Sequence, residues 1–319
     1  MLSRRALALA GVAPLLPSAL AAQPGWRPPR PVRFIVGFGA GGPSDSVTRL
    51  VTAGMPATLG QPVIVENRAG ASGNIGMQAL LQAPADGHTL GFSGIHLATN
   101  PSLLPSLGYD PRADVQMVSQ FVALPIVVLV STRSGITSMA QLLERARTRP
   151  VVCSTAGVGT SSHLGPTLLF RTLGGEFEAI QYRSGSDAFA ALLSGDTEAM
   201  FDPPAPYHAP AVEQGRARML GIMQQTRSAA LPDVPSFGDL GLPDAAQMRS
   251  WNGACVRAGT PPAAVAALHA AIVASLTSAE VRQRLGSLGI EPAPSESPAA
   301  AQAYYLAEVE RWGRLLRPA

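Results

Sequence analysis

Apolar residues along the chain form two alternating patterns: short β-branched runs, and longer segments with apolar positions three or four residues apart. The short runs are typical of buried strands, and the longer segments are typical of helices with one apolar face. The short runs predict strands at 32–37, 62–65, 88–92, 126–130, 150–154, 178–182, 197–201, 217–223 and 250–257. The longer segments predict helices at 44–58, 74–83, 137–147, 162–173, 186–194, 204–214, 261–276, 279–287 and 298–315. This alternation favours an α/β fold of parallel, doubly wound sheets, with ligands at the carboxyl ends of the strands.

Some of the predicted helices carry residues that begin or end a helix. Ser138 and Gln141 have the spacing of a capping box, and Ser297 precedes a proline at the first helical position. Gly174 follows an apolar helix and predicts its end.

The segment from Val32 to Asp45 is the most informative part of the chain. A β-branched strand is followed by the glycine cluster 37–42 and by a helix that starts near Ser44. Unpaired N–H groups and the positive end of the dipole favour an anion at a helix N-terminus. Glycines allow several backbone amides to approach such a ligand closely. The segment therefore predicts a site for a negatively charged small molecule near residues 38–45.

Two other interpretations of this segment remain open at this point. The cluster 37–42 fits the dinucleotide pattern G-x-G-x-x-G, and Glu66 lies where an acid that binds ribose would belong. Pro43 and Asp45 argue against it, because an acid in the first helical turn would repel a pyrophosphate. The same residues are also compatible with a tight strand-to-helix turn that binds nothing.

The N-terminal residues predict export from the cytoplasm. A basic start at Met1–Arg5, an apolar stretch at Ala6–Leu16 and small residues at Ala19–Ala22 make residues 1–22 an expected signal peptide. The segment is too short to span a membrane, and no later apolar run approaches the roughly 20 residues of a spanning helix. We therefore expect an exported protein without stable membrane insertion. A nicotinamide cofactor is scarce outside the cytoplasm, which argues against an oxidoreductase.

Composition narrows the possible partners. The 319 residues carry a formal net charge of +3, and Arg4 and Arg5 belong to the predicted signal peptide. The nearly neutral remainder argues against nucleic acid as a partner. The chain contains no lysine, which excludes Walker-A phosphate binding and Schiff-base chemistry. Its length after signal removal favours two lobes.

Neither metal binding nor hydrolysis is expected from the motifs. The five histidines have no partner at ligand spacing, and Cys153 and Cys255 form no Cys-x-x-Cys pair. Both cysteines lie in apolar strand-like runs, which favours two buried free thiols over a disulfide. No G-x-S-x-G elbow is present, so no catalytic residue and no cofactor are expected.

Several predicted strands end in loops rich in hydrogen-bond donors, in both halves of the chain. Residues 153–163 repeat the order of strand, glycine and hydroxyl loop, and helix, with His163 in the first helical turn. Ser93, Tyr182 and Asp202 follow three other strands. Each loop alone is compatible with an ordinary helix cap. Together they predict a cleft between two lobes, lined by N–H and O–H donors.

Motifs over most of the chain resemble one known family, the Bug-type solute-binding receptors of tripartite tricarboxylate transporters. The matching segments, in chain order, are Phe38–Asp45, Leu59–Gly76, Ala85–Leu90, Asn100–Leu103, Tyr109–Pro111, Ser161–Leu164, Met200–Asp202, Leu231–Pro235 and Ala258–Pro261. The resemblance implies a periplasmic clamshell that holds small carboxylates by loop amides, hydroxyls and bridging waters. It also implies that Glu66 belongs to a structural turn.

The expected ligand-binding residues combine the donor-rich loops with this resemblance. They are Phe38, Gly39, Ala40, Gly41, Gly42, Ser44, Asp45, Ser93, Thr160, Ser161, His163, Tyr182, Arg183 and Asp202. The chain departs from the family pattern at Gly37, His96, Arg183, Asp187 and Pro203. Because of these departures, the identity of the ligand cannot be transferred from the family.

We therefore expect a periplasmic-binding-protein-like fold of type II with an interdomain ligand cleft. Residues 23–122 and 226–319 are expected to form the first lobe, and residues 123–225 the second, with hinges near 120–127 and 221–231. The expected partners are a small carboxylate and the membrane permease of a tripartite transporter. A ligand receptor for a sensor kinase is the alternative, and a dinucleotide-dependent oxidoreductase is a weaker one. The protein is expected to be a monomer.

Overall fold

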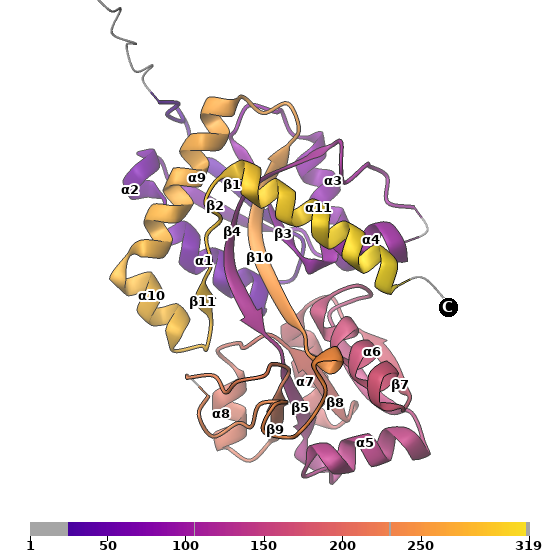
Figure 1. Cartoon of the computed structure of the whole chain (residues 1–319). Helices are drawn as coiled ribbons and strands as arrows, with labels where there is room; N and C mark the ends of the chain where they lie inside the picture. Colours follow the sequence, from indigo (N-terminus) through magenta and orange to yellow (C-terminus); the bar gives the residue numbers. More distant parts are fainter. Residues whose placement is uncertain (1–24, 105, 230, 317–319) are drawn as a thin grey trace, which may run out of the picture.

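The computed structural model describes residues 25–104, 106–229 and 231–316, so the predicted signal peptide lies outside the described residues. Two sheets with helices on their faces form two lobes, one above the other in Figure 1. The sheet of the first lobe has the strand order β11-β4-β10-β3-β1-β2, and that of the second lobe β7-β6-β8-β5-β9. The expected α/β periplasmic-binding-protein fold is therefore confirmed.

The first lobe contains both ends of the described chain. Its strands are β1 (Val32–Val36), β2 (Val63–Asn67), β3 (Thr89–Gly94), β4 (Val115–Pro125), β10 (Arg249–Arg257) and β11 (Glu291–Pro292). Its helices are α1 (Pro43–Gly54), α2 (Pro56–Leu59), η1 (Ala71–Gly73), α3 (Asn74–Gln82), α4 (Ile95–Leu103), α9 (Pro262–Thr277), α10 (Ala279–Gly286) and α11 (Pro298–Leu315).

The second lobe is built from the middle of the chain. Its strands are β5 (Val127–Ser131), β6 (Val151–Thr155), β7 (Phe177–Gln181), β8 (Ala199–Asp202) and β9 (Ala217–Ile222). Its helices are η2 (Thr132–Ser134), α5 (Met139–Thr148), α6 (Ser161–Leu173), α7 (Gly185–Ser194) and α8 (His208–Glu213), and η3 (Asp244–Ala246) lies on the way back to the first lobe.

The expectation of parallel, doubly wound sheets was correct for only part of each sheet, because both sheets are mixed. Strand β1 pairs parallel with β2 and β3, but β10 pairs antiparallel with β3 and β4. In the second sheet β6 is parallel to β7 and β8, whereas β5 is antiparallel to β8 and β9. The chain leaves the first sheet at β4 and returns to it as β10, so the returning strand runs opposite to its neighbours. Antiparallel pairing needs no helical crossover, and alternation in the sequence therefore does not reveal it.

The crossing between the lobes is short on one side. Only Ile126 separates β4 from β5, inside the segment 120–127 that was expected to act as a hinge. Strand β4 reaches Pro125 and pairs there with Arg249 of β10. The exact division of the chain into lobes stays a prediction.

Two elements beside the cleft were missed in the sequence. Strand β4 has polar residues at Gln116, Ser119 and Gln120, which interrupt its apolar pattern although most of the strand is buried. Helix α4 follows β3 without a turn and contains Pro101, and its first six residues are all buried. A helix buried on every side has no amphipathic period. The helix expected at 44–58 is divided into α1 and α2 before Pro56, as the missing N–H of proline requires.

The local predictions of helix ends are confirmed. Ser138 Oγ accepts the N–H of Gln141 at the start of α5, and Ser297 Oγ accepts the N–H of Ala300 at the start of α11. Gly174 follows the last residue of α6. Cys153 and Cys255 are both buried and free, as expected.

Apolar packing holds the helices against both sheets and continues between the lobes. Leu97 of α4, Phe201 of β8 and Trp251 of β10 belong to one buried cluster that includes residues of both lobes. Within the described residues, no single helix is long and apolar enough to cross a membrane. Helices α9 and α10 together have the necessary length and apolar composition, but the pair is bent by 67°. The apolar residues of these two helices pack on the first sheet.

Candidate functional site

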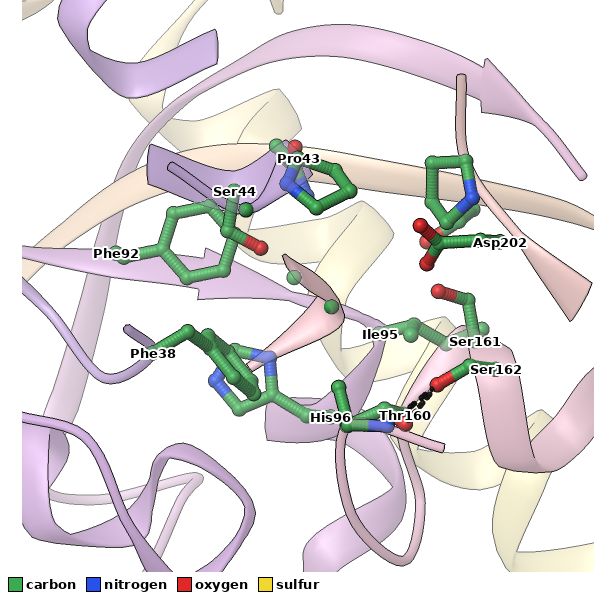
Figure 2. Close-up of a pocket in the computed structure, with 17 residues that line it drawn as sticks. Phe38, Pro43, Ser44, Phe92, Ile95, His96, Thr160, Ser161, Ser162 and Asp202 are labelled. Atoms are coloured by element: carbon green, nitrogen blue, oxygen red, sulfur yellow. Dashed lines mark hydrogen bonds between the residues drawn. The ribbon is translucent and has the colours of Figure 1, made fainter. Parts of the chain in front are cut away.

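Four helix N-termini meet at one cavity between the lobes. Helices α1 and α4 of the first lobe begin at Pro43 and Ile95, and α6 and α7 of the second begin at Ser161 and Gly185. All four of these first residues line the same cavity. Figure 2 shows three of these residues, Pro43, Ile95 and Ser161, at the cavity.

The local sequence explains why the helices begin here. Each of the four helices follows a strand: α1 follows β1, α4 follows β3, α6 follows β6 and α7 follows β7. The glycine loop 37–42 and the hydroxyl-rich loop 156–160 bring the chain from strand to helix. Ser184 caps α7 by accepting the N–H of Asp187 at 3.1 Å. The carboxyl ends of strands from two sheets thus supply the walls of one site.

The electrostatics of the cavity favour an anion held by dipoles. Each helix N-terminus carries a partial positive charge of roughly +0.5. Among the described residues that line the cavity there is no arginine, and the single acidic side chain is Asp202. The lining residues are Phe38, Gly42, Pro43, Ser44, Phe92, Gly94, Ile95, His96, Ala156, Thr160, Ser161, Ser162, Gly185, Asp202, Pro203, Ser250 and Asn252. An anionic group can therefore be bound here without a salt bridge to a side chain.

Aromatic rings form one side of the cavity (Figure 2). The ring of Phe38 meets that of His96 edge-on, with centroids 5.0 Å apart, and Phe92 stacks on His96 at 5.6 Å. Burial lowers the pKa of His96 to about 3, so its imidazole is neutral near pH 7. This side of the site is therefore an uncharged surface suited to the carbon skeleton of a ligand.

Asp202 lies on the opposite side, at the end of β8, with two donors behind it. Tyr207 Oη donates to Oδ2 of Asp202 at 3.4 Å, and His208 Nε2 lies 3.4 Å from the same oxygen. The N–H of Ala205 donates to His208 Nδ1, so in a neutral ring the proton is on Nε2 and faces the carboxyl. Burial raises the pKa of Asp202 above its ordinary value, and the hydrogen bonds from His208 and Tyr207 offset this only in part.

The other predicted acid, Asp45, is turned away from the cavity. Its carboxylate accepts the N–H of Gly41 at 2.9 Å, Nδ2 of Asn67 at 2.8 Å and Nε of Arg49 at 2.9 Å. Burial favours a higher pKa, but the hydrogen bonds from Arg49, Gly41 and Asn67 lower the pKa of Asp45 below its ordinary value. Asn67 also donates to the carbonyl of Phe38. Asp45 therefore fixes the shape of the glycine loop.

Six of the fourteen residues expected from the sequence line the cavity. They are Phe38, Gly42, Ser44, Thr160, Ser161 and Asp202. Gly39, Ala40 and Gly41 lie in the same loop, and Ser186 Oγ of the second lobe donates to the carbonyl of Ala40 at 3.4 Å. Ser93 is fully buried in β3. That any of these fourteen residues contacts a ligand stays a prediction.

Three expected residues lie beside the cavity. His163 Nδ1 accepts the N–H of Gly159, and its ring packs 6.1 Å from that of Phe177. Tyr182 and Arg183 line a neighbouring depression formed with residues 70–73 and 156–158. The Arg183 side chain therefore does not add a cation to the cavity described above.

The sequence interpretation missed His96, Ser250 and Asn252 as lining residues. Ser250 and Asn252 are two positions apart in β10, so both point to the same face of the strand. Polar residues at this spacing in an otherwise apolar strand were the available indication. The side-chain oxygen Oδ1 of Asn252 and the hydroxyl of Ser93 are buried without a partner among the described residues.

Two further expectations concern chemistry outside the cavity. The expectation that Glu66 belongs to a structural turn was wrong, because Glu66 lies in strand β2 and pairs there with Ile35 of β1. Its carboxylate accepts from Arg33 at 2.7 Å and from Arg68 at 2.6 Å, so it is held in ion pairs and is not free to bind a ribose. Within the described residues, no group of three or more His, Cys, Asp or Glu side chains is placed to hold a metal ion.

Known proteins match this chain over nearly its whole length. Residues 47–318 match the family model described as "Tripartite tricarboxylate transporter family receptor". Protein BugT of Bordetella pertussis is 30% identical, over 91% of this chain and 89% of BugT. MatC from Rhodopseudomonas palustris, solved with bound malate, is 30% identical with a TM-score of 0.84, covering 91% of this chain and all of MatC. An R. palustris protein solved with adipate is also 30% identical, with a TM-score of 0.84, over 90% of this chain and 96% of that protein.

Proposed function

Because this chain belongs to the receptor family of tripartite tricarboxylate transporters, we propose that it captures a small carboxylate between its lobes and delivers it to a membrane permease. The family consists of non-enzymatic solute-binding receptors, so the expected absence of catalysis and the resemblance to Bug-type receptors are both confirmed. The proposed location is the periplasm, where the family's binding proteins meet their solutes.

The observation that carries the proposal is the convergence of four helix N-termini on a cavity whose lining, in the described part of the chain, contains no arginine. One carboxylate of the ligand accepts from backbone amides of the loop 38–45 and of the first turn of α4. Ser161 of the second lobe contributes its hydroxyl group from the other side, where the hydroxyl of Thr160 donates to the carbonyl of Gly157 at 2.6 Å. Such hydrogen bonds to an ionised acceptor are about twice as strong as neutral ones, and they are stronger still away from bulk water.

The ligand class follows from the relatives and from the cavity together. Two relatives were solved with malate and with adipate, both small carboxylates. The cavity of this chain offers dipoles for a carboxylate and an aromatic wall for a short carbon skeleton. Bridging waters allow such a site to accept acids of different length.

Binding is proposed to close the two lobes about the β4–β5 crossing at Ile126. Residues 23–122 with 226–319 would move against residues 123–225, and the closed surface would then be presented to the permease. A buried hydrogen bond between the lobes supports this. Thr99 Oγ1 of α4 donates to the carbonyl of Gly159 at 2.7 Å.

The proposal is tested by a substitution that fills the cavity, at a glycine where a side chain fits the backbone. Gly42 has an ordinary φ of −72°, and a Cβ there would meet no atom closer than 3.6 Å. Gly42→Val places a branched side chain among the helix N-termini and should weaken carboxylate binding at least about tenfold, which corresponds to about 1.4 kcal/mol. Gly25→Val is the matched control, because a Cβ at Gly25 meets nothing within 4 Å.

Both variants and the unchanged protein are compared by calorimetry against a panel of small carboxylates that includes malate and adipate. A ligand at about 100 times its Kd should stabilise the unchanged protein and Gly25→Val by about 2.7 kcal/mol in thermal unfolding. Equal affinity in Gly42→Val and Gly25→Val, with both folded, would place the site elsewhere.

A further inference from the structure

One carboxylate group of the protein itself faces the cavity. Asp202 is 3% exposed, and Figure 2 shows its carboxyl group pointing from the wall toward the cavity, near the hydroxyl of Ser161. A buried acid beside an anion site needs an explanation, because like charges in a site of low dielectric repel strongly.

The two oxygens of Asp202 have different surroundings. Tyr207 Oη and His208 Nε2 both lie 3.4 Å from Oδ2. A side chain at Gly185 would also approach Oδ2, at 3.5 Å from its Cβ. Within the described residues, no donor is bonded to Oδ1. One oxygen is therefore held by the protein, and the other remains available as an acceptor.

Asp45 gives a useful contrast. Its carboxylate has three protein donors, Gly41, Asn67 and Arg49, and its side chain does not line the cavity. Asp202 pairs with no arginine among the residues that the structure describes, and it lies at the cavity wall with the first residues of α6 and α7. The dipoles of these two helices favour the ionised form of Asp202.

We infer that Asp202 accepts a hydrogen bond from an N–H or O–H group that the ligand carries next to its carboxylate. This inference rests on the proposed function and narrows its substrate class to amino or hydroxy carboxylates. The ligand carboxylate then faces the N-termini of α1 and α4, and its donor faces Oδ1 of Asp202. A plain dicarboxylate is disfavoured while Asp202 is ionised, because it would bring a second acceptor to an oxygen that then only accepts.

Succinate, malate and aspartate are the probes, since they share a four-carbon skeleton and differ in a hydrogen, a hydroxyl or an ammonium group. In the unchanged protein, malate and aspartate should bind at least about tenfold more tightly than succinate. Asp202→Asn keeps the shape and an acceptor oxygen but removes the charge. This variant should bind aspartate about tenfold more weakly or worse, and its affinity for malate should fall less. Its affinity for succinate should stay unchanged or increase.

Asp187→Asn is the matched control, because Asp187 is an exposed acid in the first turn of α7 and does not line the cavity. It should leave the order of the three ligands unchanged. Tyr207→Phe removes one donor from Oδ2 and leaves the cavity-facing oxygen unchanged. This variant should still bind malate and aspartate more tightly than succinate.

Each outcome decides between the two proposals. If succinate binds as tightly as malate and aspartate, and Asp202→Asn changes nothing, the inference is overturned while the carboxylate site stands. If all three acids fail to bind and the wider carboxylate panel also fails, the proposed function is overturned as well. If another carboxylate without a donor binds and these three do not, the inference alone is overturned.

Discussion

The backbone N–H of Gly41 donates to Oδ2 of Asp45 at 2.9 Å, so the acid in the first turn of α1 closes the glycine loop from behind. Gly41 has a φ of +78°, a left-handed conformation that suits glycine and turns its amide toward this carboxylate. The loop that is proposed to bind an anion thus owes its shape to a protein anion on its other side.

Asp45→Ala should destabilise the protein by about 1–3 kcal/mol, because it removes the acceptor that the part-buried N–H of Gly41 and the guanidinium of Arg49 share, and leaves Asn67 with the carbonyl of Phe38 alone. Urea unfolding followed by circular dichroism measures the change. Asp233→Ala is the control, since Asp233 is exposed, and its change should stay within about 0.5 kcal/mol. Equal stability of the two variants would contradict the structural role of Asp45.

The lowered pKa of Asp45 also predicts an acid-dependent loss of stability. Hydrogen bonds from Arg49, Gly41 and Asn67 outweigh burial and hold the folded pKa of Asp45 below its ordinary value of 3.8. Its contribution is therefore present above about pH 4 and is lost as the pH falls through the folded pKa. In Asp45→Asn the free energy of unfolding should fall less between about pH 5 and 3 than in the unchanged protein. Parallel pH profiles of the two proteins would count against this linkage.

Asp202 should make the binding of a ligand with an ammonium group pH-dependent. Burial raises the pKa of Asp202 above 3.8 in the ligand-free protein, with Tyr207, His208 and the N-termini of α6 and α7 facing it. An ammonium group favours the ionised form, so the affinity for aspartate should fall as the pH drops through this raised pKa. Calorimetry across that range should give a steeper profile for the unchanged protein than for Asp202→Asn. The same profile in both proteins would exclude Asp202 as the titrating group.

His96 should stay neutral throughout the physiological range. Its imidazole is packed against Phe38 and Phe92, and burial lowers its pKa to about 3. The ring resonances of His96, assigned by their loss in His96→Gln, should not shift between about pH 5 and 8 in NMR spectra. A titration within that range would show that the aromatic wall is more accessible to water than the packing indicates.

The contact between Thr99 and Gly159 should favour the closed arrangement of the lobes. Thr99→Val keeps the shape and removes the hydroxyl that donates to Gly159, a bond worth about 0.5–1.5 kcal/mol. Ligand affinity should fall by about two- to tenfold, and X-ray scattering should show a larger radius of gyration in solution. Thr167→Val is the control, because Thr167 donates within α6 to His163 and does not join the lobes. Compaction by ligand that is identical in both variants would remove Thr99 from the closing contacts.

The sequence by itself determined the local units of this protein. The strand, glycine loop and helix at residues 32–54 follow from the apolar period and from glycine. The cap at Ser138 follows from Gln141 three positions on, and the cap at Ser297 follows from the proline directly after it. These features depend on contacts within one turn or one strand, which a linear pattern records. The family motifs added the identity of the fold to these units.

The tertiary structure alone decided which of these residues face the cavity. Asp45 turns inward because Asn67, from the end of β2, meets it, and Asp202 faces the cavity because Tyr207 and His208 hold it from behind. Strand β4 was missed because polar residues interrupt its apolar run, and helix α4 was missed because its buried first six residues show no amphipathic period. Strand β10 brings Ser250 and Asn252 to the site by antiparallel pairing. Such placements depend on pairings between residues far apart in the chain, and a local pattern of apolar and polar positions does not contain them.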